Sequence, residues 1–236
     1  CFFLSSNPFF HQTRPPPPLY REHPPVGVPT HLHKKLFLGT SNGLFSVPIN
    51  QSTDLSFTMG TFNSIEKLKG QVWALANINN QLLVGHHEGA FVLKKNSVLP
   101  LSSTKVFWNF VPLSSTFLTS KIIAGGYFGL SIFDYKNNNF SYTTKIPDFI
   151  ESSRFVVADK NEAIWISQPY HGVFKLIHNE NDTYTSFTYN DKKGLPSTFS
   201  NHVYKIKNEL VVATEKGVYS YNEQKDIFEP SLLYQN

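Results

Sequence analysis

A glycine-anchored motif recurs five times along the chain at nearly constant spacing. Its copies read LFLGTSNGLFSV, LLVGHHEGAFVL, IIAGGYFGLSIF, IWISQPYHGVFKL and LVVATEKGVYSY. The anchor glycines lie 46, 40, 43 and 45 residues apart, at Gly43, Gly89, Gly129, Gly172 and Gly217. A chain with this period must stack similar modules, because each module alone is too small to bury its apolar residues.

Each copy of the motif predicts a β-hairpin. Three apolar residues lead to a small residue, a short turn reverses the chain, and the anchor glycine supplies either a positive φ or room for a close backbone approach. The residue two positions after the anchor is aromatic in four copies, at Phe45, Phe91, Phe174 and Tyr219. Apolar residues on both sides of the second strand indicate a sheet packed between two other sheets.

Two further strands fit into each period. One precedes the hairpin, at 72–75, 108–111, 155–158 and 203–206, and one follows it, at 55–59, 140–143, 184–188 and 227–229. Four short strands in such a period are typical of one blade of a β-propeller. We therefore expect an all-β propeller whose blade units span about 34–68, 69–104, 105–150, 151–196 and 197–236.

The N-terminal region predicts an incomplete first unit. Residues 1–33 hold 8 of the 15 prolines and show no sustained alternation, which indicates a disordered arm or linker. Pro24, Pro25 and Pro29 occupy the place of the innermost strand of the first unit. Either a partner strand, such as 232–234, fills that gap, or the chain belongs to a larger propeller of the seven-bladed type.

The segment 193–230 resembles a known repeat. Its GLPS turn at 194–197, the strand LVVAT at 210–214 and the GVYSY stretch at 217–221 resemble the regulator-propeller repeat of bacterial two-component-type sensors. The stretch 151–176 is similar to the subgroup in which a triple-tyrosine domain follows the propeller. The resemblance covers 34–236, although GLPS occurs only once. Neither a Trp-Asp dipeptide nor a Gly-Gly pair in every blade is present, which disfavours WD and kelch repeats.

This resemblance implies a function in binding rather than catalysis. It implies an extracytoplasmic sensor or interaction propeller on the periplasmic or cell-surface side of a membrane protein, often dimeric through the propeller. The ligand would be an oligosaccharide or a peptide, and the parent protein could carry a histidine kinase domain. The alternatives are a passive platform for protein partners and, less favoured, a propeller lyase or hydrolase with a base at His171 or Tyr170.

Several kinds of chemistry are disfavoured by composition. Cys1 is the only cysteine, which excludes an intrachain disulfide and a cysteine-based zinc site. The net charge of +4 comes from scattered residues, so we expect no nucleic-acid binding, and no apolar run is long enough to span a membrane. The expected innermost strands contain no Asp or Glu, and no GxSxG motif occurs, so we assign no catalytic residue and no cofactor.

The candidate binding site is the face where the Gly-anchored hairpin turns meet the segments that enter each innermost strand. Aromatic faces beside imidazole, amide and guanidinium donors suit a sugar or a peptide. Trp73 could instead be core, Tyr127 and Phe128 could cover its rim, and Arg154 could pair with Asp148 or Glu151. Neighbouring side chains in extended backbone point apart, so we assign no metal site to His86 and His87. The candidate ligand-binding residues are Trp73, His86, His87, Tyr127, Phe128, Arg154, Tyr170, His171, Asn201 and His202.

Overall fold

Five antiparallel sheets of four strands each make up the fold. The computed structural model describes residues 28–49, 61–94, 97–113 and 120–232. In each sheet the strands are neighbours in chain order, so every sheet is a simple meander. We refer to the five sheets as blades 1 to 5.

The strands have the following bounds. Blade 1 contains β1 (Val28–Leu32), β2 (Lys35–Thr40), β3 (Gly43–Pro48) and β4 (Asn63–Lys69). Blade 2 contains β5 (Val72–Ile78), β6 (Gln81–His86), β7 (Gly89–Lys94) and β8 (Ser97–Ser102), and blade 3 contains β9 (Phe107–Pro112), β10 (Lys121–Gly126), β11 (Gly129–Lys136) and β12 (Asn139–Lys145). Blade 4 contains β13 (Phe155–Ala158), β14 (Ile164–Gln168), β15 (Gly172–His178) and β16 (Tyr184–Tyr189), followed by the 3-10 turn η2 (Asp191–Lys193). Blade 5 contains β17 (His202–Ile206), β18 (Glu209–Thr214), β19 (Gly217–Asn222) and β20 (Ile227–Pro230).

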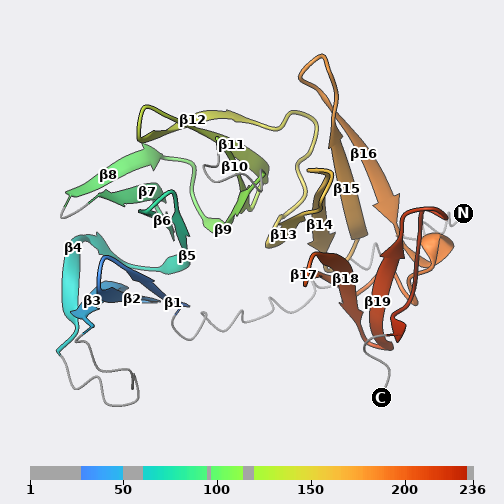
Figure 1. The fold of residues 1–236 in the computed structure, drawn as a ribbon, viewed down its shortest axis with the longest axis horizontal. Helices are drawn as coiled ribbons and strands as arrows, with labels where there is room; N and C mark the ends of the chain where they lie inside the picture. The colour runs from blue at the N-terminus through green and yellow to red at the C-terminus, as the bar shows by residue number, and fades with distance from the viewer. Residues whose placement is uncertain (1–27, 50–60, 95–96, 114–119, 233–236) are drawn as a thin grey trace, which may run out of the picture.

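The blades are arranged radially around a common axis. The first strands β1, β5, β9, β13 and β17 contact one another in succession and line the centre, while the fourth strands lie outside (Figure 1). The arc formed by the described residues is open between β17 and β1 (Figure 1). The expected propeller architecture is therefore confirmed, as an arc of five blades.

The hydrophobic core lies between consecutive blades. Phe37 and Val72 belong to the cluster between blades 1 and 2, and Leu83 and Phe133 to the cluster between blades 2 and 3. Ile123 and Leu176 join blades 3 and 4 in the same way, and a further cluster joins blades 4 and 5. Each internal blade buries apolar residues on both faces, as the pattern of the motif predicted.

The anchor glycines meet both conditions that the motif suggested. Gly129 has a φ of 85°, and a Cβ at this position would lie 2.0 Å from the carbonyl oxygen of Phe149. Gly217 has a φ of 117°, but a Cβ there would meet no atom within 4 Å. The positive φ thus accounts for the glycine in blade 5, whereas blade 3 also needs the absence of a side chain so that the next connection can pass.

The expectation that blade 1 lacks its innermost strand was wrong. Residues Val28–Leu32 form β1, which pairs with β2 along its whole length and places Pro29 opposite Leu38. Because β1 is the edge strand of the sheet, a proline that lacks an N–H group can be accommodated there. Residues 28–32 of the expected arm therefore belong to the sheet, and residues 1–27 lie outside the described residues.

Other expected strands differ in detail from the observed ones. The expected strand at 55–59 lies outside the described residues, and the fourth strand of blade 1 is β4. Leu232 belongs to no strand, and 233–234 are also outside the described residues. The part of the chain that the structure describes contains no helix with the length and apolar character of a membrane span.

Candidate functional site

The hairpin turns and the segments that enter the innermost strands lie together on one end of the blades, which we call the entrance face. The amide of His87 donates to the carbonyl of Gln71, that of Ser153 donates to Gly126, and that of Ser200 donates to Pro169, at 2.9 to 3.0 Å. These bonds tie each turn to the connection beside it. The opposite end, which carries the other turns of each blade, is the exit face.

His86 and His87 contact each other, contrary to the expectation that their side chains point apart. Their ring centroids are 4.2 Å apart because His86 ends β6 and His87 already lies in the turn. Buried His86 donates from Nε2 to the carbonyl of Lys69 at 3.0 Å and accepts at Nδ1 from the amide of Glu88 at 3.2 Å. Burial, with the neighbouring His87, lowers the pKa of His86. Both nitrogens of His86 are therefore occupied within the protein, and its ring holds the turn in place.

Trp73 and Asn201 lie largely in the interior. Trp73 is half-buried at a bulge of β5, and its indole nitrogen is buried with no partner among the described atoms. Asn201 is fully buried and donates from Nδ2 to the carbonyl of Ser197 at 2.9 Å, while its Oδ1 has no partner in the described part of the chain. The two residues therefore offer little surface to a ligand.

Tyr127 and Phe128 form the exposed tip of the β10–β11 turn. The Tyr127 ring packs edge-on against Trp108 with centroids 4.5 Å apart, and the ammonium of Lys145 lies 6.0 Å from the Phe128 centroid. Tyr127 thus covers a core residue, as one of the alternatives stated. Phe128 projects beyond it.

A hydrogen-bonded contact between two side chains joins blade 4 to the connection that precedes it. The Nδ1 atom of His171 lies 2.9 Å from Oε2 of Glu151, and the Oε1 atom of Gln168 accepts from the amides of Tyr170 and His171. His171 is exposed, and Tyr170 lies beside it in the same turn. This arrangement fixes the turn and presents an aromatic ring and an imidazole to solvent.

Arg154 lies where the chain enters β13. Its guanidinium carbon is 6.0 Å from the Phe155 centroid, and Phe155 in turn packs edge-on against His202 with centroids 4.6 Å apart. Burial and then the charge of Arg154 lower the pKa of His202. The cluster therefore favours the neutral form of His202 and brings blades 4 and 5 together at the centre.

Four exposed apolar side chains lie on neighbouring segments of the entrance face in blades 3 to 5. We call this the entrance row, and its members are Phe128 at 74%, Ile150 at 78%, Tyr170 at 52% and Phe199 at 57% exposure. A soluble monomer scatters such residues singly, so their succession is a distinct surface feature. Phe128 and Tyr170 were predicted site residues, whereas Ile150 and Phe199 were missed.

The segments that carry these four residues lie close to one another along the entrance face. Ile150 lies next to Gly129, whose absent Cβ would be 3.5 Å from the Cα of Ile150. Glu151, which follows Ile150, contacts His171, which follows Tyr170. Ser200, which follows Phe199, donates to the carbonyl of Pro169, which precedes Tyr170, at 3.0 Å. The sequence signal for Ile150 and Phe199 was an apolar residue beside a turn, which is not specific by itself.

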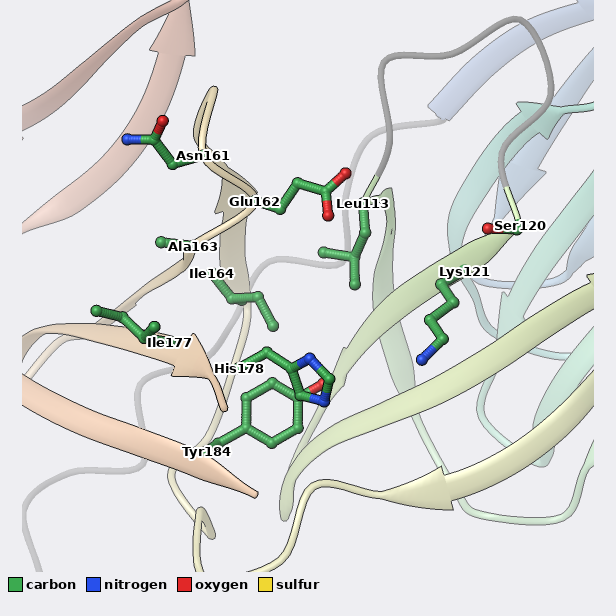
Figure 2. A pocket seen from close by; sticks show the side chains of 10 residues that line it. All are labelled: Leu113, Ser120, Lys121, Asn161, Glu162, Ala163, Ile164, Ile177, His178 and Tyr184. Carbon is green, nitrogen blue, oxygen red and sulfur yellow. The ribbon is translucent and has the colours of Figure 1, made fainter. Parts of the chain in front are cut away.

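A pocket opens on the exit face between blades 3 and 4 (Figure 2). Its cavity volume is about 390 Å³, within the range of small-molecule sites. None of the ten predicted site residues lines it. Its lining residues are Leu113, Ser120, Lys121, Asn161, Glu162, Ala163, Ile164, Ile177, His178 and Tyr184.

Comparisons with solved structures support the fold at low sequence identity. An extracellular domain attributed to a hybrid two-component system of B. thetaiotaomicron matches with a TM-score of 0.58 at 15% identity, over 89% of this chain and 28% of that one. The WD40 β-propeller domain of Doa1 matches with a TM-score of 0.54 at 11% identity, over 84% of this chain and 64% of that one. A Bacteroides fragilis protein assigned as a 6-phosphogluconolactonase matches with a TM-score of 0.57 at 10% identity, over 88% and 69%.

These matches establish the propeller fold and no more. The chain spans little more than a quarter of the extracellular two-component-system domain that it resembles in structure. A scan against models of protein families and a search of curated protein sequences each returned no match.

Proposed function

We propose that the chain is a recognition segment of an extracellular sensor propeller in a bacterial signalling protein, and that it binds a ligand on its entrance face. The entrance row is the observation that carries this proposal. Exposed aromatic rings next to the imidazole of His171 suit an oligosaccharide or a peptide, which bind by stacking and directed hydrogen bonds.

The resemblance to two-component sensors supports this assignment and adds its context. The likeness in fold to an extracellular sensor domain agrees with the GLPS-containing repeat at 193–230. On this proposal the chain lies on the periplasmic or cell-surface side, belongs to the triple-tyrosine subgroup and acts through an output domain such as a histidine kinase. It binds rather than catalyses.

A panel of oligosaccharides and peptides tests the proposal by thermal melting. A ligand that binds only the folded chain must raise the melting midpoint. Tyr170→Ala and Phe128→Ala are expected to abolish the shift, whereas Phe187→Ala, which removes an exposed aromatic ring from the outer strand β16, leaves it unchanged. If the ligand shifts the melting midpoint equally in all three variants, the proposal is contradicted.

The same row also suits the second candidate function, a platform for protein partners or a homodimer. Exposed apolar residues gathered on one face are typical of protein interfaces. Sedimentation of the wild-type chain and of Phe128→Ala separates the two functions. A platform that pairs with a second copy dissociates in the variant without any added ligand.

The enzymatic alternative has a direct test. His171 is exposed and paired with Glu151, so a substrate could reach it. Turnover of a lactone or polysaccharide substrate that is lost in His171→Ala at unchanged stability would support an enzyme. Undiminished turnover in that variant removes His171 as a base.

A further inference from the structure

The exit-face pocket between blades 3 and 4 contains two charged side chains of opposite sign. Lys121 begins β10 and shares its side of the strand with Ile123, which packs into the core between these two blades. Glu162 lies in the turn between β13 and β14. Among the described residues, neither side chain forms a hydrogen bond or an ion pair.

The equivalent place between blades 2 and 3 is bridged by hydrogen bonds. Gln81 begins β6 as Lys121 begins β10, and its Nε2 atom donates to the carbonyl and the Oδ1 of Asn138, both at 3.0 Å. Lys94 donates to Oδ1 of Asn139 at 2.7 Å. Gln81 and Lys94 thus bond to blade 3 at the exit-face end, although the Oε1 atom of Gln81 has no partner among the described atoms.

The interface between blades 4 and 5 is also bridged. Lys160 pairs with Glu223 at 2.8 Å, and Nδ2 of Asn161 donates to the other carboxylate oxygen of Glu223 at 2.8 Å. Lys160 and Asn161 come from the same turn as Glu162. The turn therefore reaches blade 5 with two of its side chains and leaves its carboxylate on the side of blade 3.

The remaining walls of the pocket combine aromatic and apolar surface. His178 and Tyr184 are partners in the β15–β16 register, with ring centroids 5.0 Å apart, and the Nε2 atom of His178 lies 3.1 Å from Oδ1 of Asp182. Figure 2 shows Lys121 directed toward these two rings, with Glu162 at the other side of the opening. Leu113 and Ile164 complete the apolar side.

We propose that this pocket binds a small zwitterion of the α-amino-acid type. Its carboxylate would lie on the ammonium of Lys121, its ammonium on the carboxylate of Glu162, and its apolar side chain against Tyr184, Leu113 and Ile164. A ligand with a single charge would satisfy only one of the two protein charges and would leave the other facing it unpaired. The proposal is independent of any ligand on the entrance face.

Three related probes test each charge separately. Isothermal titration of the 236-residue chain with L-leucine, L-leucinamide and N-acetyl-L-leucine compares a zwitterion with a cation and an anion of similar shape. We expect L-leucine to bind at least about tenfold more tightly than either analogue. In Lys121→Gln, the protein should no longer bind L-leucine more tightly than L-leucinamide. In Glu162→Gln, it should no longer bind L-leucine more tightly than N-acetyl-L-leucine.

Matched variants elsewhere serve as controls. Lys205 and Glu215 are exposed, and their side chains have no partner among the described residues, so Lys205→Gln and Glu215→Gln remove the same charges away from the pocket. Both are expected to bind L-leucine as the wild type does, and so is the entrance-row variant Phe128→Ala. The proposal is overturned by the absence of L-leucine binding up to about 10 mM. Equal binding of the three probes, or an equal loss in the control variants, also overturns it.

Discussion

Blade 3 and blade 5 carry the same motif, yet their third strands differ in burial. In β11 the first five residues are buried, whereas no residue of β19 is buried. Blade 3 packs against blades 2 and 4, while the described core of blade 5 is shared with blade 4 alone. The burial of a blade is therefore decided by its neighbours rather than by its own pattern.

The two blades also use different chemistry in their cores. Phe107, Phe110 and Phe133 pack with centroids 5.7 to 6.0 Å apart between blades 2 and 3, and their rings carry no polar group. Between blades 4 and 5, the hydroxyls of Tyr189 and Tyr221 donate to Oδ1 of Asp226 at 2.5 and 2.7 Å.

This polar cluster shifts the pKa values of its members. Lys193 pairs with the other oxygen of Asp226 at 2.7 Å. Burial works to raise the pKa of Asp226, but the hydrogen bonds from Lys193, Tyr189 and Tyr221 outweigh it and hold this pKa well below its usual range. Burial and the bond to Asp226 raise the pKa of Tyr189. Blade 5 thus shares a charged, hydrogen-bonded cluster with blade 4 in addition to its apolar contacts.

The largest expected effect comes from truncating the core of blade 3. Phe133→Ala empties a fully buried site and should cost about 3–5 kcal/mol of unfolding free energy. Tyr219→Ala, at a half-buried position of β19, should cost less than half as much. Urea denaturation measures both, and equal losses would show that blade 5 is as well packed as blade 3.

A methyl group at the anchor glycines separates backbone conformation from close contact. Gly129→Ala should cost about 2–3 kcal/mol, because the new Cβ meets the carbonyl of Phe149 and φ is positive. Gly217→Ala should cost about 1 kcal/mol, since only the positive φ opposes it. If the two costs are the same in urea denaturation, the close contact in blade 3 has no energetic weight.

Removing the charge of Asp226 tests the polar cluster. Asp226→Asn should cost about 1–2 kcal/mol, because Lys193 loses its partner and the two tyrosine hydroxyls lose a charged acceptor. Asp148→Asn serves as the control, because Asp148 is exposed and forms no hydrogen bond or ion pair with the described residues, and it should leave the denaturation midpoint in place. If Asp226→Asn leaves the free energy of unfolding unchanged, the cluster contributes only packing to stability.

The smallest effect is expected in the dependence of the melting temperature on pH. The raised pKa of Tyr189 means that its contribution is complete below the ordinary tyrosine pKa of about 10 and is lost as the pH rises beyond it. The lowered pKa of Asp226 means that its contribution is complete above about pH 4 and is lost as the pH falls. Tyr189→Phe should flatten the alkaline limb of the curve and Asp226→Asn the acidic limb. If both variants show the same acidic and alkaline limbs as the wild type, this cluster is not the source of the pH dependence of the melting temperature.

The predicted site residues differ in exposure, and their place in the sequence did not indicate this difference. His86 and Asn201 stand beside turns as ligand-binding residues often do, yet both are buried and bonded to the backbone. Phe128 and Tyr170 are exposed as a binding surface requires. Position relative to a turn indicates the face on which a residue lies, but not whether its side chain points outward.

The exit-face pocket could not be found from the sequence. Lys121 and Glu162 stand in different blades, and nothing in either segment marks it as unpaired. The contrast with Gln81 and Lys160 emerges only when each blade is seen against the next.

The repeated glycine motif by itself determined the five hairpins and the propeller architecture, because glycine conformation and strand alternation are local properties. The tertiary structure decided that Val28–Leu32 completes the first blade, which side chains of the entrance face reach solvent, and which charges between blades stay unpaired. Those outcomes depend on contacts between residues that are distant in the chain, and a periodic pattern carries no information about them.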